Sequence, residues 1–368
     1  MAGGGLRLFL GGDVMLGRGV DQILPHPGDP ALWERSVSDA RTYVRLAEQK
    51  NGVIPAPVGF DWPWGDALGL LDRFAPDVRM VNLETSVTTS DRAEPGKAVH
   101  YRMNPGNLPA LTIAEPDVCS IANNHILDFG AGGLAETLEV VGRAGLRTVG
   151  AGLTVADALR PAVVTIGSRR VIVFSFGTAS SGVPTYWSAT TSRPGVAFLP
   201  DLSDDTAADV AARVRALKRP GDLAVLSVHW GSNWGYDVPS SHRRFADRVI
   251  RGGIDLVYGH SSHHPRPIEI CRDRLVLYGC GDLIDDYEGI AGYEQHRDDL
   301  RMLYFVTLDP AGRLADLRMA VLQASRMRLR PARPEDREWT CRTLDRVSRR
   351  YGTRLTVAQD GMLRLKTA

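Results

Sequence analysis

Short apolar runs rich in valine and isoleucine alternate along this chain with longer segments of helical pattern. The apolar runs have the length and composition of strands that are buried on both faces of a sheet. Alternation of such strands with helices favours a layered α/β architecture. The predicted strands are Leu6–Leu10, Val78–Val81, Val118–Ile121, Ala162–Ile166, Val171–Phe176, Leu223–Val228, Leu256–Tyr258 and Leu275–Tyr278, and the predicted helices are Trp64–Phe74, Gly133–Ala144, Asp204–Leu217 and Ser241–Gly252.

Two stretches depart from this alternation. Residues 25–62 are rich in Pro and Gly at both ends and have a helical pattern at Pro30–Gln49, which indicates an insertion or a lid near the site. After residue 310 the pattern changes to an Arg-rich helix followed by two short strands, Leu355–Val357 and Met362–Leu365. We therefore expect a catalytic domain over residues 1–310 and a small C-terminal appendage over residues 311–368.

Charge and cysteine usage exclude several classes of protein. The formal net charge is +1, so no overall attraction to nucleic acid or to a membrane surface is expected. The four cysteines form no CxxC pair, which argues against a zinc knuckle or a disulfide framework. The chain has no apolar run of roughly 18 residues, the length of a transmembrane helix. The first predicted strand begins after only five residues, and we expect a cytoplasmic protein.

Five polar motifs each follow a predicted strand. In α/β sheets, loops converge beyond the carboxyl ends of the strands, so side chains from distant segments can meet at one point. Carboxylate, amide and imidazole ligands suit one or two divalent cations such as Mn, Fe, Zn, Mg or Ca, and the absence of cysteine argues against a structural zinc site. The motifs are Gly12-Asp13, Asn82-Leu83-Glu84, Asn123-Asn124-His125, His229-Trp230-Gly231 and Gly259-His260.

Each motif also has an ordinary structural explanation. Asp13 after two glycines is typical of a turn or a helix N-cap. His229 after an apolar run is equally compatible with a core histidine. His260, His263 and His264, by contrast, lie within five residues of one another after a buried strand, a density that packing alone seldom explains. Together the motifs favour a metal site over separate structural roles.

The order of these motifs resembles the CapA family, which is named for poly-γ-glutamate synthesis and is similar to the calcineurin-like metallophosphoesterases. The resemblance covers roughly residues 6–307, and the combined motifs are specific. It implies a four-layer α/β/β/α sandwich with a one- or two-metal centre between the two sheets.

The resemblance also implies roles for individual residues. His125 matches the acid or base of an Asn-His pair. Asp128 would orient the His125 imidazole, although it is also compatible with a simple helix cap. Glu84 stands where the phosphoesterases use a bridging aspartate. The residues that match metal ligands are Asp13, Glu84, Asn124, His229 and His260.

Two positions depart from the phosphoesterase pattern. Met15 and Ser262 stand where that pattern has histidines. A register change would let His263 or His264 compensate, and we predict His264 as a further ligand. The departures put a full two-metal phosphatase site in doubt and favour one firmly held metal.

Within the CapA family the chain resembles a lasso-peptide epimerase, which inverts a residue of a ribosomally made precursor peptide. This resemblance implies a metal-dependent, cofactor-independent peptide epimerase. A divalent cation would stabilise the enolate formed when a Cα proton leaves, and two histidines would remove and return the proton from opposite faces. We predict His125 and His296 as that pair, although His296 lies in a polar loop and is equally compatible with a surface histidine.

The expected partner is a precursor peptide, with no nucleic acid and no membrane. Aromatic side chains in loops near the motifs would hold a bulky residue, and neighbouring arginines would bind a carboxylate. Core packing or surface exposure is an open alternative for each of them. The candidate substrate-binding residues are Trp187, Trp234, Tyr236, Arg18, Arg266 and Arg297.

Two other functions remain open. In a CapA-type metallohydrolase, the metal would activate water for attack on a γ-glutamyl amide bond or a phosphoester. A binding protein that keeps the fold with weakened metal ligands is the third possibility, and only the departures at Met15 and Ser262 support it. The spacing of the motifs predicts a metal site and does not distinguish an epimerase from a hydrolase.

Overall fold

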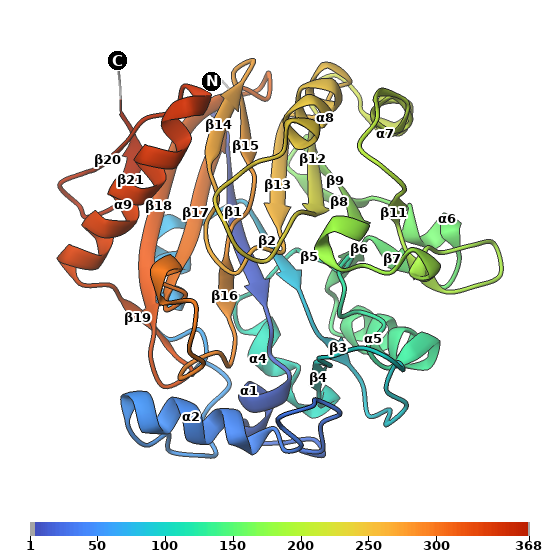
Figure 1. Cartoon of the computed structure of the whole chain (residues 1–368). Helices are drawn as coiled ribbons and strands as arrows, with labels where there is room; N and C mark the ends of the chain where they lie inside the picture. The colour runs from blue at the N-terminus through green and yellow to red at the C-terminus, as the bar shows by residue number, and fades with distance from the viewer. Residues whose placement is uncertain (1–3, 367–368) are drawn as a thin grey trace.

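Two β-sheets form the centre of the computed structural model, which describes residues 4–366 (Figure 1). The larger sheet has ten strands. In spatial order it contains β20 (Leu355–Val357), β21 (Leu363–Leu365), β18 (Leu314–Ala324), β17 (Leu300–Leu308), β1 (Leu6–Val14), β2 (Val78–Leu83), β5 (Val118–Ser120) and β6 (Arg147–Val149), with β16 (Asp282–Ile284) beside β1 and β19 (Leu329–Pro331) beside β18.

The second sheet has seven strands. Its order is β11 (Phe198–Leu199), β9 (Arg169–Thr178), β12 (Leu223–His229), β13 (Leu256–His260), β15 (Arg274–Leu277) and β14 (Ile268–Cys271), with β8 (Ala162–Ile166) beside β9. Two small pairs lie outside these sheets, β3 (Ser86–Val87) with β4 (Arg102–Met103) and β7 (Ala151–Gly152) with β10 (Gly195–Val196).

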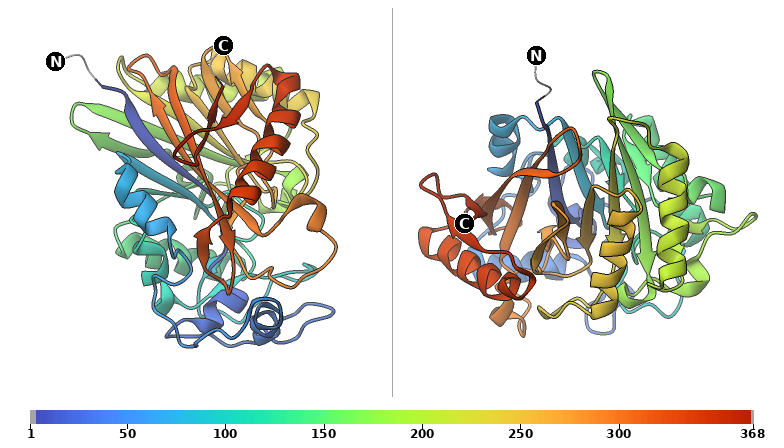
Figure 2. Two further views of the ribbon diagram at one scale, coloured as in Figure 1. Left: turned by 90° about the vertical axis from the view of Figure 1, so that its left-hand side faces the viewer. Right: turned by 90° about the horizontal axis from the view of Figure 1, so that it is seen from above.

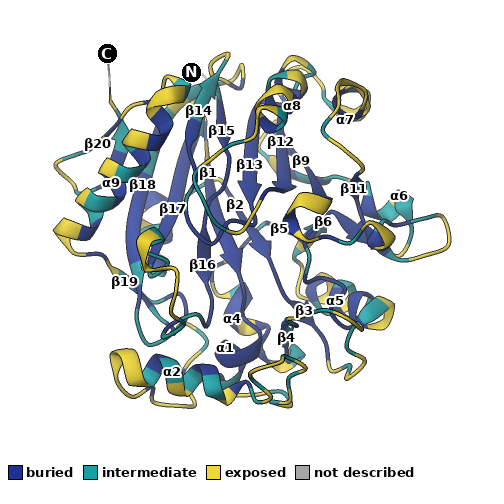
Figure 3. Cartoon of the chain, in the orientation of Figure 1, coloured by how far each residue is buried: buried dark blue, intermediate teal, exposed yellow. Residues whose placement is uncertain are grey.

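Alternating side chains in the strands divide the apolar core into three clusters. In β1, Leu8 and Leu10 belong to the cluster between the sheets, whereas Phe9 belongs to the cluster on the outer face. In β12, Val225 faces the other sheet and Leu226 faces outward. Both faces of each sheet are therefore covered, and the strands are almost wholly buried (Figure 3). The predicted four-layer sandwich is confirmed.

Helices cover the outer faces of both sheets (Figure 2). The start of α7 shows how the sequence sets an element boundary, because the Ser203 side chain accepts a hydrogen bond from Thr206 N at 3.2 Å and caps the helix. On the larger sheet lie α3 (Ala67–Phe74), α4 (Pro109–Thr112) and α5 (Gly130–Arg143), and on the second sheet lie α6 (Val155–Ala158), α7 (Asp204–Leu217) and α8 (Ser240–Arg251). The helices α1 (Arg18–Ile23) and α2 (Arg41–Asn51) lie beyond the strand ends, at the bottom of Figure 1, and α9 (Pro334–Ser348) packs beside β18 and β20.

Some elements differ from the prediction. The helix expected at Pro30–Gln49 occupies Arg41–Asn51, and residues 31–40 before it form a loop that an isolated bridge between Ala31 and Asp39 closes. The long antiparallel pair of β17 and β18 was not predicted. Residues 311–368, the expected appendage, contain α9 and add β18 to β21 to the larger sheet. No helix within residues 4–366 has the length and apolar character needed to cross a bilayer.

An extra residue in β1 determines where Asp13 points. Leu10 pairs with Met80 and Asp13 pairs with Asn82, so β1 advances three residues while β2 advances two. This bulge moves Asp13 from the helix-covered side of the sheet to the side that faces the second sheet. Gly12 lies at the bulge because a Cβ there would come within 1.7 Å of the Gly281 carbonyl oxygen.

His242 packs into the outer core of the second sheet. Its ring stacks on Trp230 with the centroids 4.4 Å apart, and Trp230 also donates to the carbonyl oxygen of Tyr278 at 3.0 Å. Burial, assisted by the charge of Arg266, lowers the pKa of His242 to about 4. The folded protein therefore keeps this ring neutral under mildly acidic conditions.

This histidine predicts an acid-sensitive fold. The unfolded chain binds a proton at His242 below its ordinary pKa of 6.5, whereas the folded chain resists that proton down to about 4. Stability is therefore complete above pH 6.5 and falls between pH 6.5 and 4, by up to about 3 kcal/mol from this residue. Urea unfolding at pH 7.5 and pH 5 should show a smaller difference for His242→Phe than for the wild type. Equal differences would contradict the expectation.

Candidate metal centre

The carboxyl ends of parallel strands in both sheets meet at one place (Figure 1). Asp13 comes from β1, His229 from β12 and His260 from β13. Each offers a ligand atom, and these atoms lie within 4.8 Å of one another in fully buried positions. The larger sheet supplies the carboxylate and the second sheet supplies the imidazoles, so the cluster joins the two halves of the sandwich.

Glu84 and Asn124 complete the surroundings of this cluster. Nδ1 of His229 and Nδ1 of His260 lie 2.7 Å apart. The other ring nitrogen of His229 is 2.8 Å from Oδ1 of Asn124 and 3.7 Å from Oε1 of Glu84. The amide of Asn82 donates to both Asp13 and Glu84 at 2.8 Å and thereby fixes the two carboxylates.

The electrostatics of the cluster favour a bound cation. Burial, reinforced by Asp282, raises the pKa of Asp13 to about 7, and burial raises the pKa of Glu84 as well. Burial lowers the pKa of His260 to about 3 and also lowers that of His229. The two imidazoles are therefore neutral, and they lie beside two desolvated carboxylates. The lone pairs on these nitrogen and oxygen atoms lack a positively charged partner within the cluster. A divalent cation fits this donor set of carboxylate oxygen, amide oxygen and imidazole nitrogen.

A histidine–aspartate pair lies beside the cluster. Nδ1 of His125 is 2.7 Å from Asp128, and Nε2 of His125 is 4.0 Å from Glu84. Lys97 donates to Asp128 and to the backbone oxygen of Asn124. Burial, assisted by Lys97, lowers the pKa of His125 to about 4. The ring is therefore neutral, with its Nδ1 proton held by Asp128 and a lone pair on Nε2.

These groups surround an open cavity of about 230 Å³. Glu84 and Asn124 connect the buried cluster to the cavity, and Lys97 and His125 form part of its wall. His263 lines the same cavity and belongs to a second histidine–aspartate pair, in which its Nδ1 lies 3.0 Å from both Asp282 oxygens. The sequence analysis named His263 only as a residue that could compensate for a missing metal ligand, and Asp282 and Lys97 were missed.

Comparison with known proteins identifies the family. The model of a family described as bacterial capsule synthesis protein PGA_cap matches residues 7–287. The chain belongs to this PGA_cap family. It is 54% identical over 366 residues to a probable polyglutamine synthesis accessory protein of Mycobacterium tuberculosis, and the match covers 99% of this chain and 96% of that protein.

Other matches are more distant. The PGA biosynthesis protein CapA of Bacillus subtilis is 25% identical over 247 residues, which are 65% of this chain and 60% of that protein. Among solved structures, a 5'-nucleotidase precursor from Thermus thermophilus aligns with a TM-score of 0.47 and 15% identity over 86% of this chain and 54% of that one. The predicted resemblance to the CapA family is confirmed by the family match and the CapA relative.

The two departures from the phosphoesterase pattern have structural roles in this PGA_cap member. Met15 is fully buried and its sulfur accepts a hydrogen bond from the Tyr287 hydroxyl at 3.8 Å. Ser262 donates to the carbonyl oxygen of His264 at 2.9 Å. Neither side chain adds a ligand to the cluster formed by Asp13, His229 and His260.

The structure does not bring His264 or His296 to the cluster. His264 accepts a hydrogen bond from Gly235 N at 3.0 Å on one ring nitrogen and lies 3.0 Å from the Pro265 oxygen through the other. Because backbone groups occupy both nitrogens, the expectation of His264 as a metal ligand is wrong. His296 stacks on His264 at 4.5 Å and lines a different pocket, beside Trp339. His296 therefore does not face His125 across one cavity.

Most of the predicted substrate-binding side chains are held in contacts within the protein and are not placed at the candidate site. Only Trp234 and Arg18 line a cavity next to the metal cluster. Arg18 is buried in ion pairs, whereas Trp187 is buried over Lys97, and Tyr236 packs on His264 and His296. The remaining two arginines bind within the fold, Arg266 to the Ser232 and Asp237 backbone and Arg297 to Asp299 and Asp336.

Proposed function

We propose that this chain is a metal-dependent hydrolase that cleaves an amide bond in a glutamate- or glutamine-containing chain. The observation that carries this proposal is the position of His125, which Asp128 orients and which faces the same cavity as Glu84 and Asn124. The names of two relatives, a polyglutamine synthesis accessory protein and a PGA biosynthesis protein, support the choice of substrate.

A divalent cation held by Asp13, Glu84, Asn124, His229 and His260 would lower the pKa of a water molecule and polarise the amide oxygen. The lone pair on Nε2 of His125 takes a proton from the attacking water. Asp128 stabilises the imidazolium that forms, because its carboxylate lies 2.7 Å from Nδ1. The same Nε2 then gives the proton to the leaving nitrogen as the carbon–nitrogen bond breaks. One water is consumed, and a carboxylic acid and an amine are produced.

A peptide epimerase is the second candidate, and one observation favours it. The histidines of two histidine–aspartate pairs, His125 with Asp128 and His263 with Asp282, line a single cavity. Removal and return of a Cα proton require two such groups on opposite faces of the substrate. In this scheme His263 takes the role that the sequence had suggested for His296.

Incubation of the metal-loaded protein with γ-glutamyl and glutaminyl oligopeptides in D2O separates the two functions. The hydrolase proposal expects new amino groups and no deuterium at Cα in uncleaved substrate. Deuterium at Cα without cleavage would instead establish the epimerase. Released phosphate from p-nitrophenyl phosphate, with the peptides intact, would identify a phosphoesterase. The matched control is His125→Gln, which should be inactive in whichever assay responds.

A further inference from the structure

A second cavity of about 210 Å³ adjoins the cavity beside the metal cluster. The two share four residues, Val99, Asn233, His263 and Tyr287, as parts of a common wall. A substrate bound at the cluster therefore lies directly beside the second cavity. The function proposed above uses no residue that belongs to this second cavity alone.

Four Trp and Tyr rings contribute to the wall of this cavity. Trp234 and Tyr293 stack almost parallel, with centroids 4.0 Å apart and an angle of 5° between the planes. Tyr43 and Tyr287 contribute two further rings. Faces and edges of aromatic rings bind organic cations as well as apolar groups. The charges around the rings decide between these two kinds of ligand.

The arginine that lines this cavity, Arg18, is already neutralised. Its Nε donates to Asp286 at 2.9 Å, one terminal nitrogen also binds Asp286, and the other donates to Glu34 at 2.9 Å. The guanidinium stacks 3.7 Å from the Tyr43 ring centre. All three of its nitrogens therefore donate within the protein, and two carboxylates balance its charge. One cation between two carboxylates leaves this side of the cavity negative.

Asp298 adds a carboxylate that has no protein partner. Within residues 4–366 its side-chain oxygens make no hydrogen bond to another residue, and no ion pair lies within 4.0 Å. Burial raises the pKa of Asp298 from its ordinary value, and the nearby charges of Arg301 and Lys50 offset this rise only in part. A carboxylate without a hydrogen-bond partner at the wall of an aromatic cavity attracts a cation that brings its own hydrogen-bond donors.

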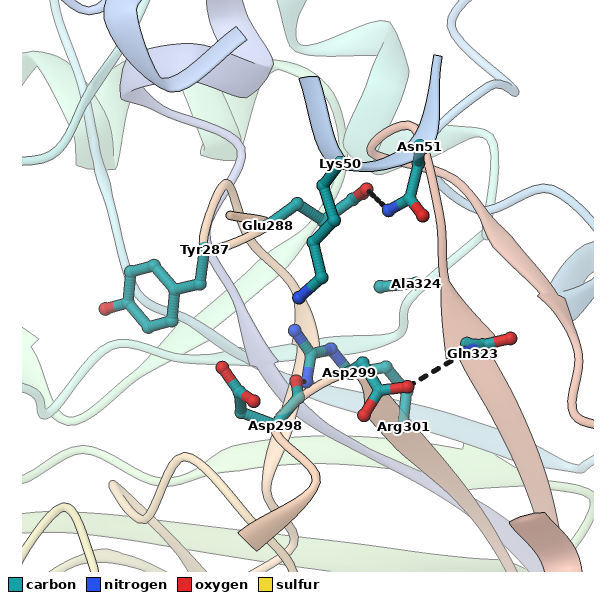
Figure 4. A pocket seen from close by; sticks show the side chains of 9 residues that line it. All are labelled: Lys50, Asn51, Tyr287, Glu288, Asp298, Asp299, Arg301, Gln323 and Ala324. Carbon is teal, nitrogen blue, oxygen red and sulfur yellow. Dashed lines mark hydrogen bonds between the residues drawn. The ribbon is translucent and has the colours of Figure 1, made fainter. Parts of the chain in front are cut away.

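Figure 4 shows the small polar pocket on the other side of Asp298. Lys50 and Arg301 line that pocket, and the two hydrogen bonds drawn there join Glu288 to Asn51 and Asp299 to Gln323. Neither of these bonds reaches the Asp298 carboxylate. Arg301 pairs with Asp285 and donates to the backbone oxygen of Asp298, so neither of these bonds uses the side-chain oxygens of Asp298.

We propose that the cavity lined by Trp234, Tyr293, Tyr287, Tyr43 and Asp298 binds a primary ammonium group of the substrate. The inference rests on the proposed hydrolase and names a feature of its substrate. The ammonium donates to Asp298 while its attached carbons contact the rings. The bond to be cleaved lies in the adjoining cavity, so the recognised amine is a few bonds away from the reaction centre.

Calorimetric titration with hexylammonium tests the site, and 1-hexanol serves as the uncharged probe of the same length. We expect hexylammonium to bind at least about tenfold more tightly than hexanol, and Asp298→Asn to remove that preference. Asp209→Asn, at an exposed position of α7, is the matched control and should bind as the wild type does. Equal binding of the two probes, or an unchanged preference in Asp298→Asn, overturns the proposal.

Two further experiments are needed. The first identifies the source of the amine, and the second tests the ammonium site independently of the proposed hydrolase. Three peptides identify the source of the amine, with acetyl-Gln-Gln-Gln as the reference that has no amino group. Tighter binding of Gln-Gln-Gln than of the reference indicates the amino terminus of the chain. Tighter binding of acetyl-Gln-Lys-Gln than of the reference indicates a lysine side chain. If neither peptide binds more tightly than the reference, the site does not act on peptides and the inference fails. The His229→Ala/His260→Ala variant should still bind hexylammonium, so a failed hydrolase assay leaves this titration interpretable.

Discussion

The double variant His229→Ala/His260→Ala is expected to lose its bound metal and at least about 10³-fold of its turnover. The two imidazoles are the ligands that the second sheet contributes, and their Nδ1 atoms lie 2.7 Å apart. Without them Asp13 and Glu84 remain as buried carboxylates, which bind a divalent cation only weakly. Loss of several kcal/mol of transition-state stabilisation corresponds to a rate effect of this size.

Elemental analysis of the purified variant measures the metal directly, and circular dichroism verifies the fold. His296→Gln is the matched control, because this histidine lines a different pocket and should leave metal and turnover unchanged. A double variant that retains both metal and activity would show that the metal centre lies elsewhere. Equal losses in His296→Gln would contradict the separation of the two pockets.

The variant His125→Gln is expected to keep its metal and to lose about 10²- to 10⁴-fold in kcat. Glutamine fills much of the same space but cannot accept and return a proton. The backbone of His125 is also anchored, because Oδ1 of Asn123 accepts a hydrogen bond from its N–H at 3.1 Å, and the substitution leaves this anchor in place. Metal binding and catalysis therefore separate in this variant.

Steady-state kinetics and metal analysis of the same preparation make this distinction. A fall in kcat with unchanged metal content supports proton transfer by His125. Loss of metal together with activity would mean that His125 is a ligand, and unchanged kcat would remove it from the reaction altogether. Asp128→Asn is a less clean test, since Asp128 also accepts from Tyr101 N at 2.7 Å and from Lys97.

The sequence predicted the convergence of Asp13, His229 and His260 because strand ends obey a simple rule. Buried parallel strands are recognisable from their apolar runs, and the residues that follow them must converge. Asp13, His229 and His260 are therefore brought together by strands that lie far apart in the sequence. The helices α7 and α8 were predicted within one residue for a similar reason, since their apolar periodicity is regular.

Residues in irregular segments could not be placed in this way. His263 and His264 are neighbours, yet one lines the cavity and the other binds backbone, because a loop has no fixed side-chain period. His296 lies in a short 3-10 turn whose direction depends on its packing against His264. Lys97 reaches Asp128 from a loop without any motif. Contacts of this kind follow from tertiary packing, which no local pattern contains.

The bulge in β1 makes the metal site sensitive to chain length as well as to side-chain chemistry. Substitutions that preserve the number of residues between Leu10 and Asp13 keep the aspartate on the inner side of the sheet. Insertion of one further residue between Gly12 and Asp13 would place the aspartate opposite Leu83 and turn its carboxylate toward the helices, whereas deletion of one glycine would leave it opposite Asn82 on the inner side. A chain that differs only by that additional codon would retain its strands and its hydrophobic pattern while presenting a different side chain to the cation.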